Sequence, residues 1–434
     1  MGGGETAATR ELRALNPSLE REFIRLTDRV FVAAGYGMST FAFIIGEAGI
    51  IAVDAGSTPE ATAEALGELR RHSHLPILGL VCTHHHFDHI LGSVVLWEEN
   101  PDIEIWGIEP FANEALRLAA VGPIALQRAF RQFGHLLPPE LHINTGFASA
   151  AEARRFPLGD LPDPRVHLTR RVTGTAAVEL GGVTLQVSHN PGETDDQALV
   201  WFERDRVAFA GDNMYRSWPN LYAIRGTPYR DVRDWCESID RIRALEPAHL
   251  VLGHTLPISG AGAVDEALGV YSRALWHVYN ATIEGMNAGR TPDELVLEVR
   301  LPEDLAEHPL LREYYGAVAW SVRAIFDGVL GWFDGNPTTL NPLYPAKRAE
   351  RIAALAGGAD ILLEQARDAL AAGEAQWAAE LCDMLLAIDF RRDDVTALKA
   401  DALDEIAFNL LNATGRNYLH TYAQELRESL GAAD

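Results

Sequence analysis

The chain has 434 residues, 47% of them hydrophobic and 23% charged, a composition typical of a folded protein with room for roughly two or three hydrophobic cores. Its formal net charge of −24 argues against a nucleic-acid partner, which requires a basic face, and against an anionic membrane surface. An anionic substrate would also be repelled at long range. Such a substrate would need local positive charge in a cleft, from metal ions and a few arginines.

The cysteines and the N-terminus indicate a compartment. Cys82, Cys236 and Cys382 are odd in number, widely spaced and outside any C-x-x-C pattern, which predicts buried, reduced thiols rather than disulfides or a thiolate zinc site. The first ten residues lack the apolar core of a signal peptide, and no run of about 18 apolar residues is free of charge. We therefore expect a cytoplasmic protein without a membrane partner.

The first 260 residues alternate short apolar runs with amphipathic stretches, which is typical of a layered α/β fold. The predicted elements, in chain order, are a strand within 49–56 that ends at Asp54, a helix over 59–71, a strand over 76–83, a helix over 90–99, hairpins over 177–189 and 197–211, and a strand over 249–253. Several of these strands end at His, Asp or Glu. Loops at such ends converge on a rigid scaffold, so we expect a site there.

After about residue 265 the pattern changes to long, Ala- and Leu-rich helical periodicity, interrupted by Gly and Pro at 335–337 and 341–345. This predicts a mostly helical second region. Within it, residues 361–408 predict paired antiparallel helices around Ala-Ala-Gly-Glu at 371–374. The pair is vaguely similar to a tetratricopeptide unit, but one unit is too few for a solenoid.

The strongest local signal is Thr-His-His-His-Phe-Asp-His at 83–89, directly after a predicted strand. It contains the pattern H-x-H-x-D-H as His84, His86, Asp88 and His89. Ligands two residues apart in an extended turn can reach one metal ion, and the adjacent Asp-His pair can reach a second, so the spacing suits a binuclear site. The alternative is a solvated histidine loop whose rings bind backbone groups.

This motif, with Asp54 in Val-Asp-Ala-Gly at a strand end, resembles the metallo-β-lactamase superfamily over roughly the first 260 residues. The resemblance implies an αββα sandwich and three further metal ligands, each after a predicted strand. They are Glu193 after Pro-Gly, where the superfamily has a histidine, Asp212 after Ala-Gly, and His254 after Gly253. Asp195 and Asp196 lie near enough to compete with Glu193.

A charge count follows from this ligand set. Two divalent ions bring four positive charges, and Asp88, Glu193 and Asp212 return three, so the centre keeps about one. Histidine in place of Glu193 would leave two. The third carboxylate makes the ions weaker Lewis acids and favours harder metals, so iron or manganese are alternatives to zinc for the two ions.

A longer match narrows the resemblance to the zinc-dependent alkylsulfatases. Residues 219–231, Pro-Asn-Leu-Tyr-Ala-Ile-Arg-Gly-Thr-Pro-Tyr-Arg-Asp, are similar to that family's N-L-Y-T-L-R-G followed by R-D. The resemblance implies that Arg225 binds sulfate, with Asn220 and Tyr222 beside it in the substrate site. A guanidinium suits this role because it binds an oxyanion through two hydrogen bonds and keeps its charge. A structural ion pair is the alternative for Arg225.

Two more segments extend the resemblance and depart from it. Phe133-Gly-His-Leu-Leu-Pro is similar to the family's Y-G-x-L-L-P at the substrate pocket, with Phe133 in place of tyrosine, and Arg131 falls where the family has a second tyrosine. We expect Phe133 to contact substrate. Arg230 and Asp231 are expected to form a structural ion pair.

The helical part also resembles this family. Residues 314–316, 331–337, 373–380, 416–419 and 425–427 follow its dimerisation domain, which implies a catalytic domain over 1–290, a helical dimerisation domain over 291–434 and a homodimer. The family's sterol-carrier-like C-terminal domain has no counterpart in this sequence. The resemblance then implies a smaller substrate, or a cleft completed by the dimer partner.

Together these features imply a hydrolase that cleaves an alkyl sulfate or related anionic ester with a hydroxide held by two metal ions, Asp88 and Arg225 being catalytic. His85, His135 and His189 are candidates for protonating the leaving group. The alternatives are a lactone or thioester hydrolase, a di-iron oxygenase on the same fold, and a non-catalytic dimeric scaffold.

Overall fold

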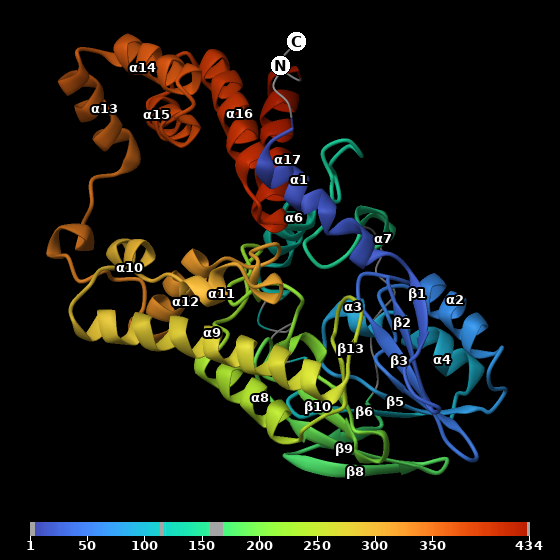
Figure 1. The fold of residues 1–434 in the computed structure, drawn as a ribbon. Coiled ribbons are helices and arrows are strands. Elements are labelled where there is room, and N and C mark those ends of the chain that lie inside the picture. Colours follow the sequence, from blue (N-terminus) through green and yellow to red (C-terminus); the bar gives the residue numbers. More distant parts are fainter. Residues whose placement is uncertain (1–4, 113–116, 118, 157–167, 432–434) are drawn as a thin grey trace.

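The computed structural model describes residues 5–112, 117, 119–156 and 168–431, and two sheets lie toward one end of the molecule, at the lower right of Figure 1. The first sheet holds its strands in sequence order: β1 (Glu22–Arg25), β2 (Val30–Ala34), β3 (Phe41–Ile45), β4 (Ile50–Val53), β5 (Ile77–Val81), β6 (Glu104–Ile108) and β7 (Arg170–Val172). The second sheet runs in the order β13 (Ile258–Ser259), β12 (His249–Val251), β11 (Val207–Phe209), β10 (Ala198–Phe202), β9 (Val183–His189) and β8 (Thr175–Leu180).

The inner strands β2–β5, β10 and β11 are buried on both faces because each face packs against a different layer. Along β2, Val30 and Val32 share a core with Val200 of the second sheet, whereas Phe31 packs with the outer helices, as the alternation of strand side chains requires. The first sheet is covered by α2 (Pro59–Leu69) and α4 (Ser93–Glu99), and the second by α8 (Val232–Ala244) and α9 (Ala261–Asn287). The predicted αββα sandwich is confirmed.

The strands and hairpins predicted for the sandwich are present, and one predicted helix differs in its bounds. The first hairpin turns at Gly181 and Gly182, whose φ angles of +57° and +82° suit glycine. The helix predicted over 90–99 is instead two helices, α3 (Phe87–Ile90) and α4. The chain breaks between them at Gly92, where any side chain would collide with Thr62 and the carbonyl of Ala55.

The second region is helical, as predicted. After α10 (Pro292–Glu298), α11 (Glu303–Ala306), η4 (Pro309–Leu311), α12 (Val318–Leu330) and η5 (Pro337–Leu340), the chain forms an arm of five helices, α13 (Pro345–Ala356), α14 (Ala359–Ala371), α15 (Ala375–Ala387), α16 (Arg392–Asn409) and α17 (Ala413–Gly431). The predicted helix pair around 371–374 is α14 and α15, which share a core through Leu363 and Leu381.

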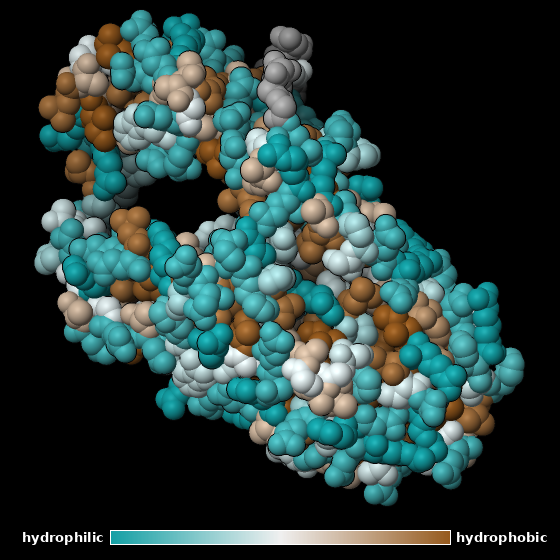
Figure 2. Space-filling model, in the orientation of Figure 1, coloured by the Kyte–Doolittle hydropathy of each residue, from teal (hydrophilic) through white to brown (hydrophobic). Residues whose placement is uncertain are grey.

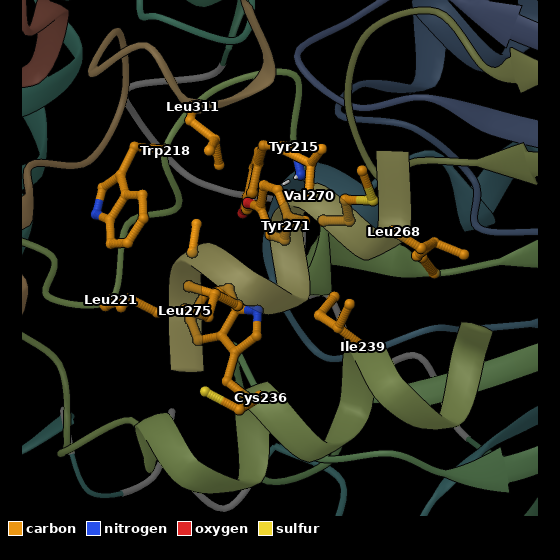
Figure 3. Packing of buried hydrophobic residues seen from close by; sticks show 14 of the residues in the cluster. Tyr215, Trp218, Leu221, Cys236, Ile239, Leu268, Val270, Tyr271, Leu275 and Leu311 are labelled. Carbon is orange, nitrogen blue, oxygen red and sulfur yellow. Dashed lines mark hydrogen bonds between the residues drawn. The ribbon is translucent and has the colours of Figure 1, made fainter. Parts of the chain in front are cut away.

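One hydrophobic core crosses residue 290, so the two regions are joined where they meet. Trp218 and Trp235 are fully buried and pack with residues such as Leu311 and Phe326 from beyond that point. Figure 3 shows Leu311 near Tyr215 and Trp218. The division of the chain at 290/291 stays a prediction.

The arm returns to the sandwich through its last helix. Arg131 of α6 (Gly122–Phe133) makes two hydrogen bonds of 3.0 and 2.5 Å to Glu425 of α17 and lies over the ring of Tyr422. An opening separates α13–α15 from the body of the molecule (Figure 2). Among the described helices, none is long and apolar enough to cross a membrane.

Candidate metal centre

The strand ends of both sheets bring the seven predicted ligands together in two groups. In each group, one possible ligand atom of every residue lies within 4.8 Å of the others. The first group is His84, His86, Glu193 and Asp212, and the second is Asp88, His89 and His254. His84 and His86 follow β5, Glu193 lies between β9 and β10, Asp212 follows β11, and His254 follows β12. Asp195 and Asp196 are in neither group.

The spacing inside the first group suits a metal ion. Nε2 of His84 lies 2.9 Å from Nδ1 of His86, and Oε2 of Glu193 lies 3.6 Å and 3.0 Å from these two atoms. Oδ2 of Asp212 lies 3.8 Å from the same His84 nitrogen. Donors about 2.1 Å from a tetrahedral zinc ion would be about 3.4 Å apart. The four donors therefore surround a space of the right size.

Asp212 lies between the two groups. In the second group, Oδ2 of Asp88 is 3.6 Å from Nε2 of His89 and 3.7 Å from Nε2 of His254. Asp212 reaches the same two nitrogens, with Oδ1 3.2 Å from His89 and Oδ2 3.1 Å from His254. A carboxylate so placed can serve two ions at once. Gly253 makes room for it, because any side chain there would collide with Oδ1 of Asp212.

Three buried ligand atoms have no hydrogen-bond partner: Nε2 of His89, Oε2 of Glu193 and Oδ1 of Asp212. Each has a neighbour across the site at 3.0 to 3.2 Å without the geometry of a hydrogen bond. Buried polar atoms are rarely left unpaired in folded proteins. Together with a donor set of imidazoles and carboxylates, they fit divalent metal ions.

Residues outside the groups fix the orientation of the histidines. Asp54, with φ at +58°, accepts hydrogen bonds from the N–H and hydroxyl of Thr83 and bonds to Nδ1 of His89 at 2.8 Å. Nδ1 of His254 lies 2.7 Å from the carbonyl of Met38. These contacts place the proton on Nδ1 and leave Nε2 as the ligand atom.

The ionisation of the ligands follows their burial and their charged neighbours. Burial, with the neighbouring His89, holds the pKa of His84 well below its usual range. For His89, burial also lowers the pKa, but the carboxylates of Asp212, Asp88 and Asp54 outweigh it and raise the pKa well above the usual value. Burial raises the pKa of Asp212, yet the surrounding histidines lower it well below the ordinary range. The Asp212 carboxylate is thus held in its ionised form.

Arg225 lies beside the first group, half-buried. Its Nη2 is 3.4 Å from Nε2 of His86, and its backbone N–H donates to Gln132 at 2.9 Å. Burial and the nearby Arg230 lower its pKa. Within the described part of the chain, no carboxylate pairs with the Arg225 guanidinium, so the alternative of a structural ion pair receives no support.

Arg230 differs from its prediction. Instead of serving as a partner for Asp231, this buried side chain places Nη2 2.7 Å from Oε1 of Glu193 and donates from Nη1 to the carbonyl of Asn220 at 2.6 Å. The Asp231 carboxylate accepts from the N–H groups of Arg233 and Asp234 at the start of α8. The sequence around Arg230 and Asp231 is typical of a surface ion pair, and it does not indicate a contact with residue 193.

The remaining predicted substrate residues lie at different depths. Asn220 is buried, and its side chain interacts with the phenol of Tyr315, whereas Tyr222 is 39% exposed. Phe133 packs against Phe147 with ring centroids 5.9 Å apart, and Phe147 lies 4.3 Å from the ring of His254. Phe133 is thus one aromatic ring away from the second group.

Two tyrosines of the site were not predicted. The hydroxyl of Tyr215 donates to Oδ2 of Asp212 at 2.8 Å, and its ring stacks on His254. The ring of Tyr315 lies 5.0 Å from that of Tyr215, and it comes from beyond residue 290. Asn412 of the arm bonds to the Tyr315 carbonyl at 2.7 Å. The only sequence signal for Tyr315 was a match to the helical domain.

The three histidines considered as proton donors lie in different surroundings. His85 bonds to Asp196 at 3.0 Å and lies next to the ring of His86. His189 is exposed and contacts the carbonyl of Asp195. His135 is buried among the rings of three phenylalanines, Phe130, Phe133 and Phe156.

Comparisons with known proteins agree with this architecture. The sequence profile of the Metallo-beta-lactamase superfamily matches residues 35–254, and that of Alkyl sulfatase dimerisation matches residues 291–429. A linear primary-alkylsulfatase of Pseudomonas sp. (strain ATCC 19151) is 34% identical, over 88% of this chain and 73% of its own. An alkyl/aryl-sulfatase of Saccharomyces cerevisiae is 28% identical, over 96% of this chain and 67% of its own.

A solved structure shows the same arrangement. The stereoselective inverting sec-alkylsulfatase of Pseudomonas sp. superposes with a TM-score of 0.83 at 25% identity, covering 95% of this chain and 68% of its own. Fold and site together define a hydrolase of the metallo-beta-lactamase superfamily. Within that superfamily, the chain belongs to the alkylsulfatase family. It is therefore an enzyme, and the alternative of a non-catalytic scaffold is set aside.

Proposed function

We propose that this enzyme hydrolyses alkyl sulfate esters, or closely related anionic esters, with two divalent metal ions, of which zinc is the first choice. The observation that carries the substrate class is Arg225. Its half-buried guanidinium lies beside His86 without a carboxylate partner among the described residues. A cation placed so, next to a metal centre in a protein of net charge −24, is suited to bind an oxyanion. The names of the alkylsulfatase relatives support sulfate.

The residues of the chain would divide the work as follows. Arg225 would hold the sulfate group through two hydrogen bonds and orient the ester against the two groups of ligands. Asp212 would bind both ions. The Tyr215 hydroxyl would orient this carboxylate, because it donates a hydrogen bond to Oδ2 of Asp212. Asp88 would complete the second group. When bound, the ions supply positive charge for the sulfate oxygens and a water-derived nucleophile at neutral pH.

The experiment is release of inorganic sulfate from short and long, primary and secondary alkyl sulfates by the metal-loaded enzyme. We expect Arg225→Ala to lower kcat/KM by roughly 30- to 1000-fold, because a charged fork contributes about 2 to 4 kcal/mol to a buried oxyanion. Metal content should not change. Arg225→Lys keeps the charge without the fork, so it should recover only part of the activity.

The control is Arg170→Ala, which removes an exposed arginine paired with Glu104 on the first sheet and should leave activity unchanged. An Arg225→Ala enzyme that keeps both metals and hydrolyses alkyl sulfates like the wild type would refute the proposed role. A wild type that binds metal but releases no sulfate from any of these esters would refute the proposed substrate.

We also propose a homodimer through the arm and through the linker that precedes it, residues 329–344. Nine large apolar side chains between residues 329 and 377 are at least 40% exposed: Val329, Leu330, Trp332, Leu340, Leu343, Tyr344, Leu355, Ile361 and Trp377. Hydrophobic (brown) side chains gather over this part of the surface in Figure 2. A patch of this kind is typical of a protein interface, and the match to Alkyl sulfatase dimerisation supports a second copy as its partner. Light scattering should give twice the chain mass of 47.6 kDa.

A further inference from the structure

The net charge expected for the metal centre is low for a site that binds an anionic ester. Three carboxylates, Asp88, Glu193 and Asp212, belong to the two ligand groups, and against two divalent ions they would leave one net positive charge. That is a weak field for holding an anionic ester. A buried cation in contact with one of these ligands would change the balance.

Arg230 is such a cation. Its exposure is 3% and that of Glu193 is 1%. Nη2 of Arg230 lies 2.7 Å from Oε1 of Glu193, while Oε2, the other oxygen, faces His86 at 3.0 Å and has no hydrogen-bond partner. Each oxygen of Glu193 would therefore face a different positive charge. One is the arginine, and the other is the ion that the first group would hold.

We infer that Arg230 is a positioning residue that sets the charge and the binding mode of the metal centre. By engaging Oε1, it leaves Glu193 a single oxygen for the metal. By adding its own charge, it restores the net charge from one to two, the value that a neutral histidine at position 193 would give. The pair of Glu193 and Arg230 thus replaces one neutral ligand. This inference rests on the metal centre of the proposed function and not on the identity of its substrate.

The contacts around the pair hold it in one arrangement. Nη1 of Arg230 donates to the carbonyl of Asn220 at 2.6 Å, and the N–H of Glu193 donates to Oδ1 of Asn213 at 3.0 Å. Asn213 directly follows Asp212, the carboxylate between the groups. Anchors of this kind outside the ligand set orient a metal ligand and tune it.

The test compares four proteins: the wild type, Arg230→Met, Glu193→His, and the double variant Glu193→His/Arg230→Met. Counted over two divalent ions, the seven ligands and residue 230, their centres would carry net charges of plus two, plus one, plus three and plus two. Each protein is loaded with Zn²⁺, dialysed against a graded chelator and analysed for retained metal. This readout does not depend on turnover.

We expect Glu193→His alone to lose metal at a chelator concentration about 10- to 100-fold lower than the wild type, because the buried positive charge of Arg230 would then lie beside two metal ions without the Glu193 carboxylate between them. The double variant should regain wild-type retention to within a few-fold. Arg230→Met should hold metal at least as tightly as the wild type, since it removes a positive charge.

The matched control is Arg416→Met. Arg416 is also buried, at 2% exposure, but it donates to the carbonyls of Ala407 and Phe408 in the arm, so its loss should leave metal retention unchanged. Arg230→Lys, which keeps the charge, should retain metal like the wild type and guards against a general effect of substitution at this position.

A double variant that holds metal no better than Glu193→His would overturn the inference, as would an Arg230→Met enzyme that loses metal as readily as Glu193→His. The second result would mean that Arg230 only supports the local fold. A wild type without metal at these residues would overturn both this inference and the proposed centre. A wild type that holds two ions but releases no sulfate would overturn the proposed substrate alone.

Discussion

The sandwich and the helical arm differ in how completely each buries its own apolar side chains. In the sandwich, the inner strands are buried on both faces by the opposite sheet and by covering helices. In the arm and its linker, Trp332, Tyr344 and Leu355 are 72%, 84% and 89% exposed. Small patches are normal on a monomer, but a run of large exposed side chains indicates a partner. The sandwich thus buries most of its large apolar side chains, whereas the arm and its linker leave several of theirs exposed, in line with the proposed dimer.

The regions also differ in what they contribute to the site. All seven candidate ligands come from the sandwich, from loops after its strands and from the short helix α3, but Tyr315 comes from the helical side and is held in place by Asn412. The candidate metal centre therefore belongs to one region, and Tyr315 brings the other region to its edge. Substitutions that act on one region and not the other would sharpen this comparison.

The largest effect is expected for Asp212→Ala, confined to the sandwich. Because its carboxylate lies between both groups, the variant should lose metal from each and lose activity by roughly 1000-fold or more. Elemental analysis and sulfate release would measure this. Its dimer should persist, because the arm is untouched. A variant that kept two metals would show that Asp212 does not bridge them.

A smaller effect, on assembly, is expected for Trp332→Glu in the linker that leads into the arm. An unpaired charge buried at an interface costs several kcal/mol, so the dimer dissociation constant should rise at least about 100-fold. Sedimentation over a concentration series would measure it. The control is Trp97→Glu, which changes a tryptophan of α4 that is 53% exposed on the sandwich. If Trp332→Glu and Trp97→Glu dissociate alike, the arm is not the interface.

The connection between regions is tested by Tyr315→Phe. The phenol interacts with Asn220 and lies near Glu193 and Arg230, and burial raises its pKa, so it stays a neutral donor. Its loss should lower kcat/KM by about 3- to 10-fold, the contribution of one hydrogen bond, with metal content unchanged. The comparable loss of a remote phenol, Tyr314→Phe, should have no effect. Equal activity of Tyr315→Phe and the wild type would confine the site to the sandwich.

The last prediction concerns acid stability and leaves the metal centre and the assembly unchanged. Burial lowers the pKa of His135 to about 4, below the ordinary value of about 6.5. The unfolded chain therefore takes up this proton before the folded protein does. Stability that is present above pH 6.5 is lost as the pH falls toward 4, by about 3 kcal/mol in all.

Replacing His135 by phenylalanine should remove this loss, since three phenylalanine rings surround the position. Urea unfolding at about pH 7 and pH 4.5 should then show a difference smaller by about 2 kcal/mol than in the wild type. His189→Phe, at an exposed position, is the control. An unchanged difference in His135→Phe would mean that the buried imidazole does not contribute to acid unfolding.

Local patterns predicted the parts of the site whose chemistry is concentrated in sequence. Four of the ligands lie within 84–89, and turn signals located the hairpin at Gly181-Gly182. The shift in the helix after β5 shows the limit of such patterns. Its break at Gly92 reflects close contacts with Thr62 and Ala55, which lie earlier in the chain. Helical periodicity alone does not record such contacts, and it also places the start of the helix a few residues late.

The sequence by itself determined the layered fold, the order of the elements and the residue types that can bind metal, because strand and helix periodicity and ligand spacing are local properties. Only the tertiary structure decided which charges meet. It turned Arg230 from an expected partner of Asp231 into the partner of Glu193, and it brought Tyr315 next to Tyr215, which lies 100 residues earlier in the chain. Such contacts arise where separate strand ends and loops converge, and no periodicity along the chain records the distance between their side chains.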